Sequence, residues 1–156
     1  MSEPIRVSPT GTHPLRHAIL RPNQPLDACV YPGDNDHTAF HLGIRDPAPE
    51  STGDHTLIAV ASFYREPLPG DAGGNPQLRI RGMAVLPAQR GKGLGRALVE
   101  AGFEIARTQS PAPTLCWCNA RTTAAGYYEK LGFTPRGDEF EIEGIGPHFV
   151  MVRELP

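Results

Sequence analysis

The sequence predicts a mixed α/β domain built around one twisted sheet. The three strand-like segments at residues 38–44, 56–64 and 77–86 precede the main helix, without the long helices that would connect parallel neighbours. A strand, a further helix and two closing strands follow that main helix. This order excludes a doubly wound nucleotide-binding fold, in which helices separate the first strands. The length of 156 residues fits one core, so we expect a single domain over residues 1–156.

Short runs of apolar, β-branched and aromatic residues predict the strands. In chain order these strands are Ile5–Val7 and residues 38–44, 56–64, 77–86, 115–118, 133–142 and 148–153. Gly82 lies inside the strand at 77–86, and a glycine inside a strand often marks a bulge or a close backbone approach. The 17 glycines and 17 prolines predict irregular connections, such as the one at residues 66–76.

Helical spacing of apolar residues predicts the helices. Thr12 can cap a short first helix that ends near Leu20. The main helix follows a glycine-rich segment and runs to about residue 109, because its apolar residues recur at helical spacing. These residues are Leu94, Ala97, Leu98, Ala101 and Ile105. Residues 122–131 form another amphipathic helix, which Gly132 closes as a C-terminal cap.

Charge and cysteine content narrow the function class and the setting. A net charge of −2 gives no sign of binding to nucleic acid or to an anionic membrane, and neither is expected as a partner. The first residues lack a secretory signal, and no stretch has the apolar length of a membrane span. Cys29, Cys116 and Cys118 are an odd number, and the single residue between the last two does not match the usual metal or redox pairs. We therefore expect a cytoplasmic protein without a metal.

The segment Arg-Gly-Lys-Gly-Leu-Gly-Arg at residues 90–96 is the most informative one in the chain. It follows a strand and opens a helix, where the first backbone N–H groups have no partner within the helix. Glycines allow close approach of an anion to these groups, and this geometry binds phosphate. The cationic side chains of Arg90, Lys92 and Arg96 add positive charge beside it.

Three interpretations of this segment compete. A nucleoside triphosphate loop requires a Gly-Lys-Ser/Thr ending, which is absent. A dinucleotide fingerprint fails because Arg96 stands where its third glycine belongs, and because the early strand–helix–strand context is absent. A glycine-rich helix start without any ligand stays open on these residues alone.

Two motifs resemble those of the GNAT acetyltransferase superfamily. Residues 83–87 (Met-Ala-Val-Leu-Pro) and 90–98 are similar to the acetyl-CoA-binding motif of this family, whose core pattern is matched by Arg90, Gly93 and Gly95. Asn119 and residues 127–133 (Tyr-Tyr-Glu-Lys-Leu-Gly-Phe) resemble its second motif. The resemblance covers residues 77–133 and implies the acyl-CoA N-acyltransferase fold, in which helices flank a central, mostly antiparallel sheet.

The resemblance also implies how acetyl-CoA is bound. The pyrophosphate would lie on the glycine turn, and the pantetheine would pair with the strand at 77–86 where that strand splays at Gly82. The backbone N–H of Val85 or of Leu86 would polarise the thioester carbonyl. Asn119 would contact the pantetheine or hold the splay. The residues implied to bind the cofactor are Met83, Val85, Arg90, Gly91, Lys92, Gly93, Leu94, Gly95, Arg96, Asn119 and Tyr128.

The implied activity is transfer of an acetyl group from acetyl-CoA to a primary amine of a small molecule or peptide. The amine would attack the thioester directly in a ternary complex, so catalysis would rest on positioning. Tyr128 takes the place of the family's usual general acid, and its phenol is protonated at neutral pH. The alternatives are a Tyr128 that only packs on the helix face, and a module that senses acyl-CoA without turnover. Family members are often dimers, which makes a homodimer the analogous expectation.

Sequence patterns do not identify the general base or the acceptor. The strand at 77–86 contains no carboxylate, so Glu66, His41, His148 or a chain of water molecules are the candidates. The cationic cluster Arg16, His17 and Arg21 either favours an acceptor that carries a carboxylate or forms a solvated helix face.

Overall fold

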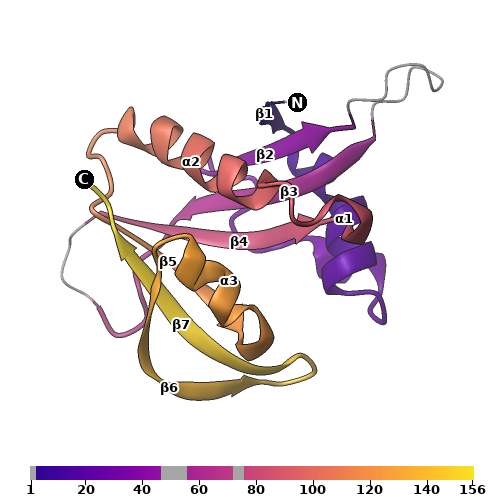
Figure 1. The fold of residues 1–156 in the computed structure, drawn as a ribbon. Coiled ribbons are helices and arrows are strands. Elements are labelled where there is room, and N and C mark those ends of the chain that lie inside the picture. Colours follow the sequence, from indigo (N-terminus) through magenta and orange to yellow (C-terminus); the bar gives the residue numbers. More distant parts are fainter. Residues whose placement is uncertain (1–2, 47–55, 72–75) are drawn as a thin grey trace. The chain divides into compact units, whose positions relative to one another are not determined.

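The computed structural model describes residues 3–46, 56–71 and 76–156 and contains a seven-stranded sheet of order β1-β2-β3-β4-β5-β7-β6 (Figure 1). The strands are β1 (Ile5–Val7), β2 (Phe40–Arg45), β3 (Leu57–Arg65), β4 (Gln77–Val85), β5 (Leu115–Arg121), β6 (Thr134–Ile142) and β7 (Gly146–Glu154). The α-helices are α1 (His13–Leu15), α2 (Leu94–Arg107) and α3 (Ala125–Lys130). The β1–β2, β2–β3, β5–β7 and β6–β7 pairs are antiparallel, and β4–β5 is parallel. The predicted mixed α/β fold with a mostly antiparallel sheet is confirmed.

The chain divides into two compact units. Unit 1 consists of Met1–Tyr64 with Gly82–Ile105, and unit 2 consists of Arg65–Arg81 with Ala106–Pro156. The strand β4 runs from unit 2 into unit 1 at Gly82, which has a φ of 65° and therefore the backbone conformation that favours glycine. The predicted irregularity of the strand at Gly82 thus coincides with the boundary between the units.

The first helix of unit 1 differs from its prediction. It begins one turn earlier, at a 3₁₀ segment (Pro9–Thr12) capped by Ser8, whose side chain accepts a hydrogen bond from the N–H of Gly11 at 3.2 Å. Thr12 holds the N-cap position of α1 but is fully buried, and its hydroxyl donates to the carbonyl of Pro9 at 2.6 Å, so its side chain makes no capping hydrogen bond. The helix α1 then widens into a π-helical turn (Arg16–Leu20).

The core of unit 1 brings the long helix α2 against β3. Leu98 and Val99 of α2 and Phe63 of β3 are all completely buried. Gly102 of α2 lies so close to Phe63 that a Cβ added there would be 2.2 Å from the ring. The absence of a side chain at this position is therefore a packing requirement.

Gly102→Ala is expected to destabilise the protein, because the added methyl group must displace a buried aromatic ring. We expect a loss of about 1–3 kcal/mol in the free energy of unfolding, the range typical of overpacked cores. Urea denaturation measures this loss. Gly126→Ala on α3 is the matched control, since its added Cβ would meet nothing within 4 Å. Equal stability of the two variants would contradict the packing described for Gly102.

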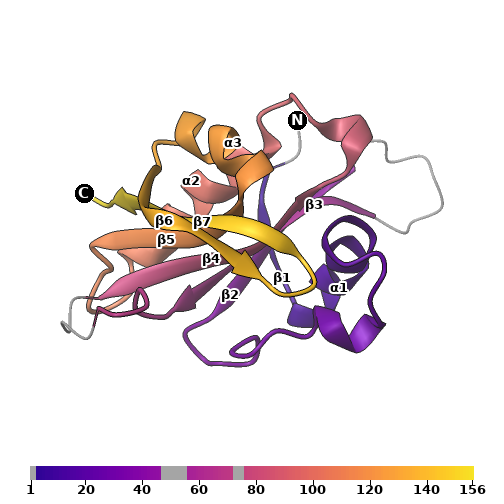
Figure 2. The ribbon, with the colours of Figure 1, turned by 90° about the horizontal axis from the view of Figure 1, so that it is seen from below.

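Unit 2 combines β5, β6 and β7 with the short helix α3. The strands β6 and β7 form a curved antiparallel hairpin, visible in Figure 2. The helix α3 contacts all three strands. Trp117 of β5 packs with Leu68 and Val152 and donates its indole N–H to the carbonyl of Glu66 at 2.8 Å. The strand β5 is three residues longer than predicted, because Asn119 to Arg121 continue the antiparallel pairing with β7.

The parallel pairing between β4 and β5 is short. It joins Gln77, Leu78 and Arg79 of β4 to Leu115, Cys116 and Trp117 of β5. Within the described part of unit 2, no pairing joins Ile80 or Arg81 to the continuation of β5. The described ladder therefore ends before Asn119. The splay at Gly82 that the resemblance implied stays a prediction.

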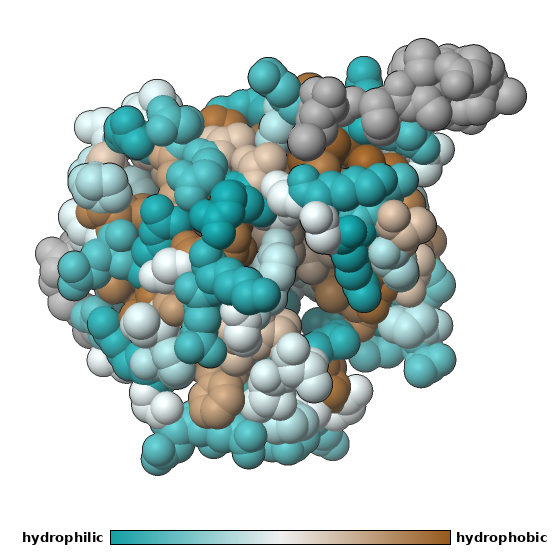
Figure 3. All heavy atoms as spheres, viewed as in Figure 1, coloured by the Kyte–Doolittle hydropathy of each residue, from teal (hydrophilic) through white to brown (hydrophobic). Residues whose placement is uncertain are grey.

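The molecular surface has few large exposed apolar side chains. Among the described residues these are Leu26, Val30 and Tyr127. On the face shown in Figure 3, hydrophilic side chains predominate and hydrophobic ones form small separate areas. Every helix in the described ranges is too short or too polar to span a bilayer. In the same ranges, no three His, Cys, Asp or Glu side chains come together as potential metal ligands.

Candidate functional site

The glycine turn presents unpaired backbone donors at the start of α2. Gly91 and Gly93 have φ values of 80° and 78°, which reverse the chain direction so that the turn leads into the helix. The first hydrogen bond into the helix is from the N–H of Ala97 to the carbonyl of Gly93, at 3.0 Å. The N–H groups of Gly91 to Gly95 donate to no acceptor in the described part of the chain. Consecutive unpaired donors at the positive end of a 14-residue helix are suited to bind an anion.

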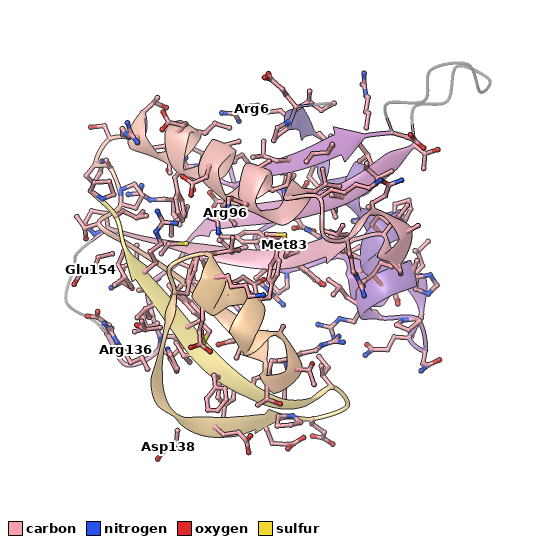
Figure 4. The ribbon with its side chains drawn as sticks, viewed as in Figure 1. Arg6, Met83, Arg96, Arg136, Asp138 and Glu154 are labelled. Carbon is pink, nitrogen blue, oxygen red and sulfur yellow. The ribbon has the colours of Figure 1, made fainter. Side chains whose placement is uncertain are left out.

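The three cationic side chains of this turn, Arg90, Lys92 and Arg96, are exposed, whereas Leu94 is buried. Arg90 donates from Nε to the carbonyl of Val85 at 3.3 Å, and Lys92 donates from Nζ to Oε1 of Gln89 at 2.9 Å. The first turn of α2 contains no acidic residue, so its positive end is not neutralised from within. Figure 4 shows Arg96 on α2 and Met83 on β4, both within unit 1.

The half of β4 that belongs to unit 1 begins at Gly82. A Cβ at Gly82 would lie 3.0 Å from Nε of Arg16 and 3.3 Å from the ring of Tyr31, so both side chains cover this glycine closely. Met83 and Val85 follow as half-buried residues. The N–H of Leu86 donates to the carbonyl of Ile58 at 2.9 Å and is therefore already engaged. Of the two predicted donors to a thioester carbonyl, Val85 is the one that stays a prediction.

Arg16 is neither a solvated residue nor a free anion-binding group. Its side chain is fully buried, and its guanidinium forms two hydrogen bonds to the carboxylate of Asp34, at 2.8 and 3.1 Å. It also donates to the carbonyl of Cys29 and to the Ser62 hydroxyl, both at 2.8 Å. Its guanidinium carbon lies 4.0 Å from the centre of the Tyr31 ring. Arg16 is thus a buried, fully paired side chain that packs against Gly82 from inside the core.

His41 belongs to the same buried network and is not available as a base. Its Nε2 lies 3.0 Å from the carbonyl of Asp34, which can only accept, so Nε2 carries the proton. Its Nδ1 lies 2.7 Å from the Ser62 hydroxyl and accepts from it. Burial lowers the pKa of His41, which keeps the ring neutral. Both ring nitrogens are therefore occupied by the protein.

Asn119 provides an unpaired acceptor in unit 2. The residue is half-buried on β5, and its Oδ1 is buried without a hydrogen-bond partner among the described residues. A buried polar atom without a partner is costly unless a ligand or water satisfies it. This atom is therefore suited to accept an N–H from a bound molecule.

Tyr128 lies on α3 and is buried, with 8% of its surface exposed. Its ring packs edge-on against Phe133, with the ring centres 5.7 Å apart. Burial, with smaller contributions from Cys118 and other neighbours, raises the pKa of Tyr128 well above its ordinary value. Its hydroxyl makes no hydrogen bond to another described residue. Tyr128 is thus a protonated phenol whose proton is not committed elsewhere.

The remaining base candidates, Glu66 and His148, differ in how they are held. Glu66 is half-buried, and its Oε2 accepts from Arg79 at 2.7 Å in an ion pair. His148 on β7 is only 4% exposed, and its Nδ1 lies 2.7 Å from the carbonyl of Gly146. Glu66 is therefore occupied, whereas His148 has one ring nitrogen engaged by the backbone.

Comparisons with known proteins give the family of this chain. The family model of the acetyltransferase (GNAT) domain matches residues 51–135. The uncharacterised N-acetyltransferase YitI of Bacillus subtilis is 39% identical over an alignment of 158 positions, which covers 99% of this chain and 97% of the relative. The chain belongs to the GNAT acetyltransferase family. This membership makes it an acyl-CoA-dependent acetyltransferase.

Solved structures agree with the GNAT fold. Escherichia coli ElaA aligns with a TM-score of 0.73 at 21% identity and covers 99% of this chain and 100% of its own. Arabidopsis thaliana NAA60 in complex with a bisubstrate analogue aligns with a TM-score of 0.77 at 14% identity over the full length of both chains. These likenesses concern the fold, because their sequence identities are low.

The structure distributes the predicted site residues of this GNAT acetyltransferase over both units. Unit 1 brings together β4 and the glycine turn, with the predicted residues Met83, Val85, Arg90, Gly91, Lys92, Gly93, Leu94, Gly95 and Arg96. Unit 2 contains Asn119 and Tyr128. Asp34, Ser62 and Tyr64 were not predicted, although they complete the network around Arg16. Their separation in sequence follows no pattern that would have revealed them.

Asp34→Asn is expected to destabilise this GNAT acetyltransferase strongly, since it leaves the buried Arg16 without a counter-charge. We expect a loss of about 3–5 kcal/mol in the free energy of unfolding. Burial alone would raise the pKa of Asp34, but hydrogen bonds from Arg16, Tyr64 and the Tyr31 N–H hold it below its ordinary value. The stabilisation is therefore present above the unfolded pKa of about 3.9 and is lost as pH falls through the lower folded value.

Urea denaturation as a function of pH tests this expectation. Asp36→Asn is the matched control, because this neighbouring carboxylate is exposed and lies outside the Arg16 network. The Asp34 variant should lose the acid dependence that the control retains. A similar small effect of both substitutions would contradict the importance of the buried pair.

Proposed function

We propose that this chain transfers the acetyl group of acetyl-CoA to a primary amine by direct attack in a ternary complex. The observation that carries the proposal is the row of unpaired N–H groups from Gly91 to Gly95 at the positive end of α2. The diphosphate of CoA is an anion that such a row binds. Arg90, Lys92 and Arg96 add the charge that neutralises it.

The pantetheine arm would extend from this turn along β4. We propose that it pairs with the backbone of Met83 and Val85, beyond Gly82, whose φ of 65° departs from regular strand geometry. Asn119 would accept an N–H of the pantetheine amides through its unpaired Oδ1. The CoA-binding residues proposed are Met83, Val85, Arg90, Gly91, Lys92, Gly93, Leu94, Gly95, Arg96, Asn119 and Tyr128.

In the chemical step, the amine nitrogen forms a bond to the thioester carbon and the carbon–sulfur bond breaks. The N–H of Val85 would stabilise the carbonyl oxygen while negative charge develops on it. Tyr128 would give its proton to the departing thiolate, as its burial and its uncommitted hydroxyl allow. The nitrogen loses one proton and the sulfur gains one, so no net proton is consumed.

The proposed acceptor is an amine, and we expect Arg21 to influence which amines the protein accepts. Arg16 is closed off by Asp34, and His17 lies 2.9 Å from the carbonyl of Gln24. Arg21 lies over the Tyr31 ring at 5.7 Å, and its buried Nε has no partner among the described residues. We propose that Arg21 is the member of this cluster that would attract a carboxylate on the acceptor.

Three broader expectations complete the proposal. The family model matches residues of both units, which supports one catalytic domain over residues 1–156. A cytoplasmic location agrees with three free cysteines. A homodimer is proposed by analogy with related enzymes.

Release of free CoA thiol from acetyl-CoA, measured with a panel of small amines and peptides, tests the proposal. We expect acetyl-CoA to stabilise the protein thermally and at least one amine to give thiol release at rates above background. Stabilisation by acetyl-CoA without thiol release on any amine would favour a sensor instead. No binding of acetyl-CoA would overturn the proposal.

A further inference from the structure

His148 is fixed by the backbone in one tautomer. The carbonyl of Gly146, 2.7 Å from Nδ1, can only accept a hydrogen bond, so Nδ1 carries the proton. In the neutral ring Nε2 is then the bare nitrogen. Nε2 makes no hydrogen bond to any residue that the structure describes. A ring that is 4% exposed with its free lone pair held in place has the form of a general base.

The position of His148 in the sheet places it beside Asn119. His148 pairs directly with Arg121 of β5, and Asn119 pairs with Val150 of β7. Because side chains two residues apart share a face, His148 and Asn119 lie on the same face as diagonal neighbours, about 7–8 Å apart at their Cα atoms. The unpaired Oδ1 of Asn119 is also an acceptor. This face of unit 2 therefore carries two unpaired acceptors and is suited to a ligand that brings N–H groups.

Tyr128 belongs to the opposite face of the same sheet. The thiols that contribute to the raised pKa of Tyr128 are those of Cys118 and Cys116, which alternate with Asn119 along β5. The proton donor and the bare nitrogen are thus on different faces of β5 and β7.

We propose that His148 is the general base of the acetyl transfer, an inference that rests on the proposed function. Nε2 takes one proton from the attacking nitrogen as that nitrogen bonds to the thioester carbon. The carbon–sulfur bond breaks, and the sulfur receives the proton of Tyr128. His148 then releases its proton to water, and Tyr128 recovers one from water, so the protons balance.

The other candidates for this role are less suitable. Both ring nitrogens of His41 are occupied, and the carboxylate of Glu66 is paired with Arg79. Arg121, which pairs with His148 across β5 and β7, is a guanidinium and cannot accept a proton. The ring of Phe140 on β6, 5.9 Å from that of His148 between centres, has no basic atom.

His148→Asn tests the inference with little structural change. The asparagine amide can still donate to the carbonyl of Gly146, but it has no basic nitrogen. We expect kcat/KM for the best amine of the panel to fall by about 100-fold or more, and the dissociation constant for acetyl-CoA to stay nearly unchanged. His37→Asn is the control, because that histidine is 93% exposed and should have no effect. Unchanged turnover in His148→Asn would overturn the inference and leave water as the base.

Chemical rescue separates a base from a packing residue. In His148→Ala, free imidazole added to the assay should restore part of the lost rate, whereas pyrazole, which has a similar shape but is a much weaker base, should not. Equal rescue by both compounds would indicate that only the volume of the ring matters, and it would overturn the inference.

Nitrogen NMR of the histidines in the full-length protein tests the inference without an acceptor. We expect His148 with a protonated Nδ1 and a bare Nε2, both alone and with acetyl-CoA. A protonated Nε2 in the neutral ring would overturn the inference. Failure of the parent protein to bind acetyl-CoA in calorimetry would instead refute the proposed function, so the two failures are distinguishable.

Discussion

Gly93→Glu is expected to raise the dissociation constant for acetyl-CoA by more than about 100-fold, which corresponds to roughly 3 kcal/mol. The substitution has two consequences at the turn. A side chain is strained at the φ of 78° that Gly93 adopts, and the new carboxylate stands where the proposed diphosphate lies. The negative charges of this carboxylate and of the diphosphate would repel each other at the positive end of α2. Isothermal titration calorimetry with acetyl-CoA measures the change.

A control variant must separate the general effects of backbone strain and added charge in Gly93→Glu from the loss of a binding site. Gly144→Glu is the matched control, because Gly144 has a φ of 79°, has nothing within 4 Å of an added Cβ, and lies in the turn between β6 and β7. This variant carries the same strain and the same charge away from the glycine turn. It should bind acetyl-CoA as the parent does. Normal affinity in Gly93→Glu would refute the placement of the diphosphate.

Tyr128→Phe is expected to lower kcat by about 100-fold to 10,000-fold, the range typical for loss of a general acid. The dissociation constant for acetyl-CoA should change little, because most of the proposed contacts are made by the backbone of unit 1. Stability should also be nearly preserved, since the lost hydroxyl makes no hydrogen bond within the described chain and the ring still packs against Phe133. Steady-state kinetics with a responsive amine measures the effect.

The neighbouring tyrosine provides the control for this experiment. Tyr127→Phe removes a hydroxyl from the same helix, at a residue that is 41% exposed, and should leave kcat unchanged. Because burial raises the pKa of Tyr128, its phenol stays protonated through neutral and moderately alkaline pH. At any pH below about 10, the parent's kcat should therefore show no loss from deprotonation of Tyr128. A Tyr128→Phe variant as fast as the parent at every pH would exclude the role of acid.

Local sequence patterns predicted the parts of the fold that depend on the spacing of apolar residues or on the position of glycines. Alternating and continuous apolar runs gave the strands, and glycines before an amphipathic helix gave the turn at residues 90–96. The turn has the unpaired donors expected there, because Gly91 and Gly93 adopt a positive φ without cost from a side chain. The acyltransferase motif, rather than the periodicity, selected Tyr128 as the candidate acid.

The first helix shows what local patterns miss. Thr12 has the chemistry of a helix cap, yet it is buried by tertiary packing and Ser8 caps the chain earlier. Arg16 has the sequence context of a solvated residue but pairs with Asp34, 18 positions away, inside the core. Long-range polar pairs have no period along the chain, so they emerge only when the backbone is folded.

The base could not be selected from the sequence for a related reason. His41 and His148 have the same chemistry and both lie in strands. Only the hydrogen bonds distinguish them, since His41 is engaged at both nitrogens and His148 at Nδ1 alone.

Backbone amide NMR of the chain with CoA and with pantetheine tests whether the glycine turn binds the diphosphate. We expect large shifts of the N–H signals of Gly91 to Gly95 on addition of CoA. Pantetheine lacks the diphosphate and should leave these signals almost unchanged at the same concentration. Unshifted signals in the presence of saturating CoA, or equal shifts with pantetheine, would contradict the claim that these five N–H groups bind the diphosphate.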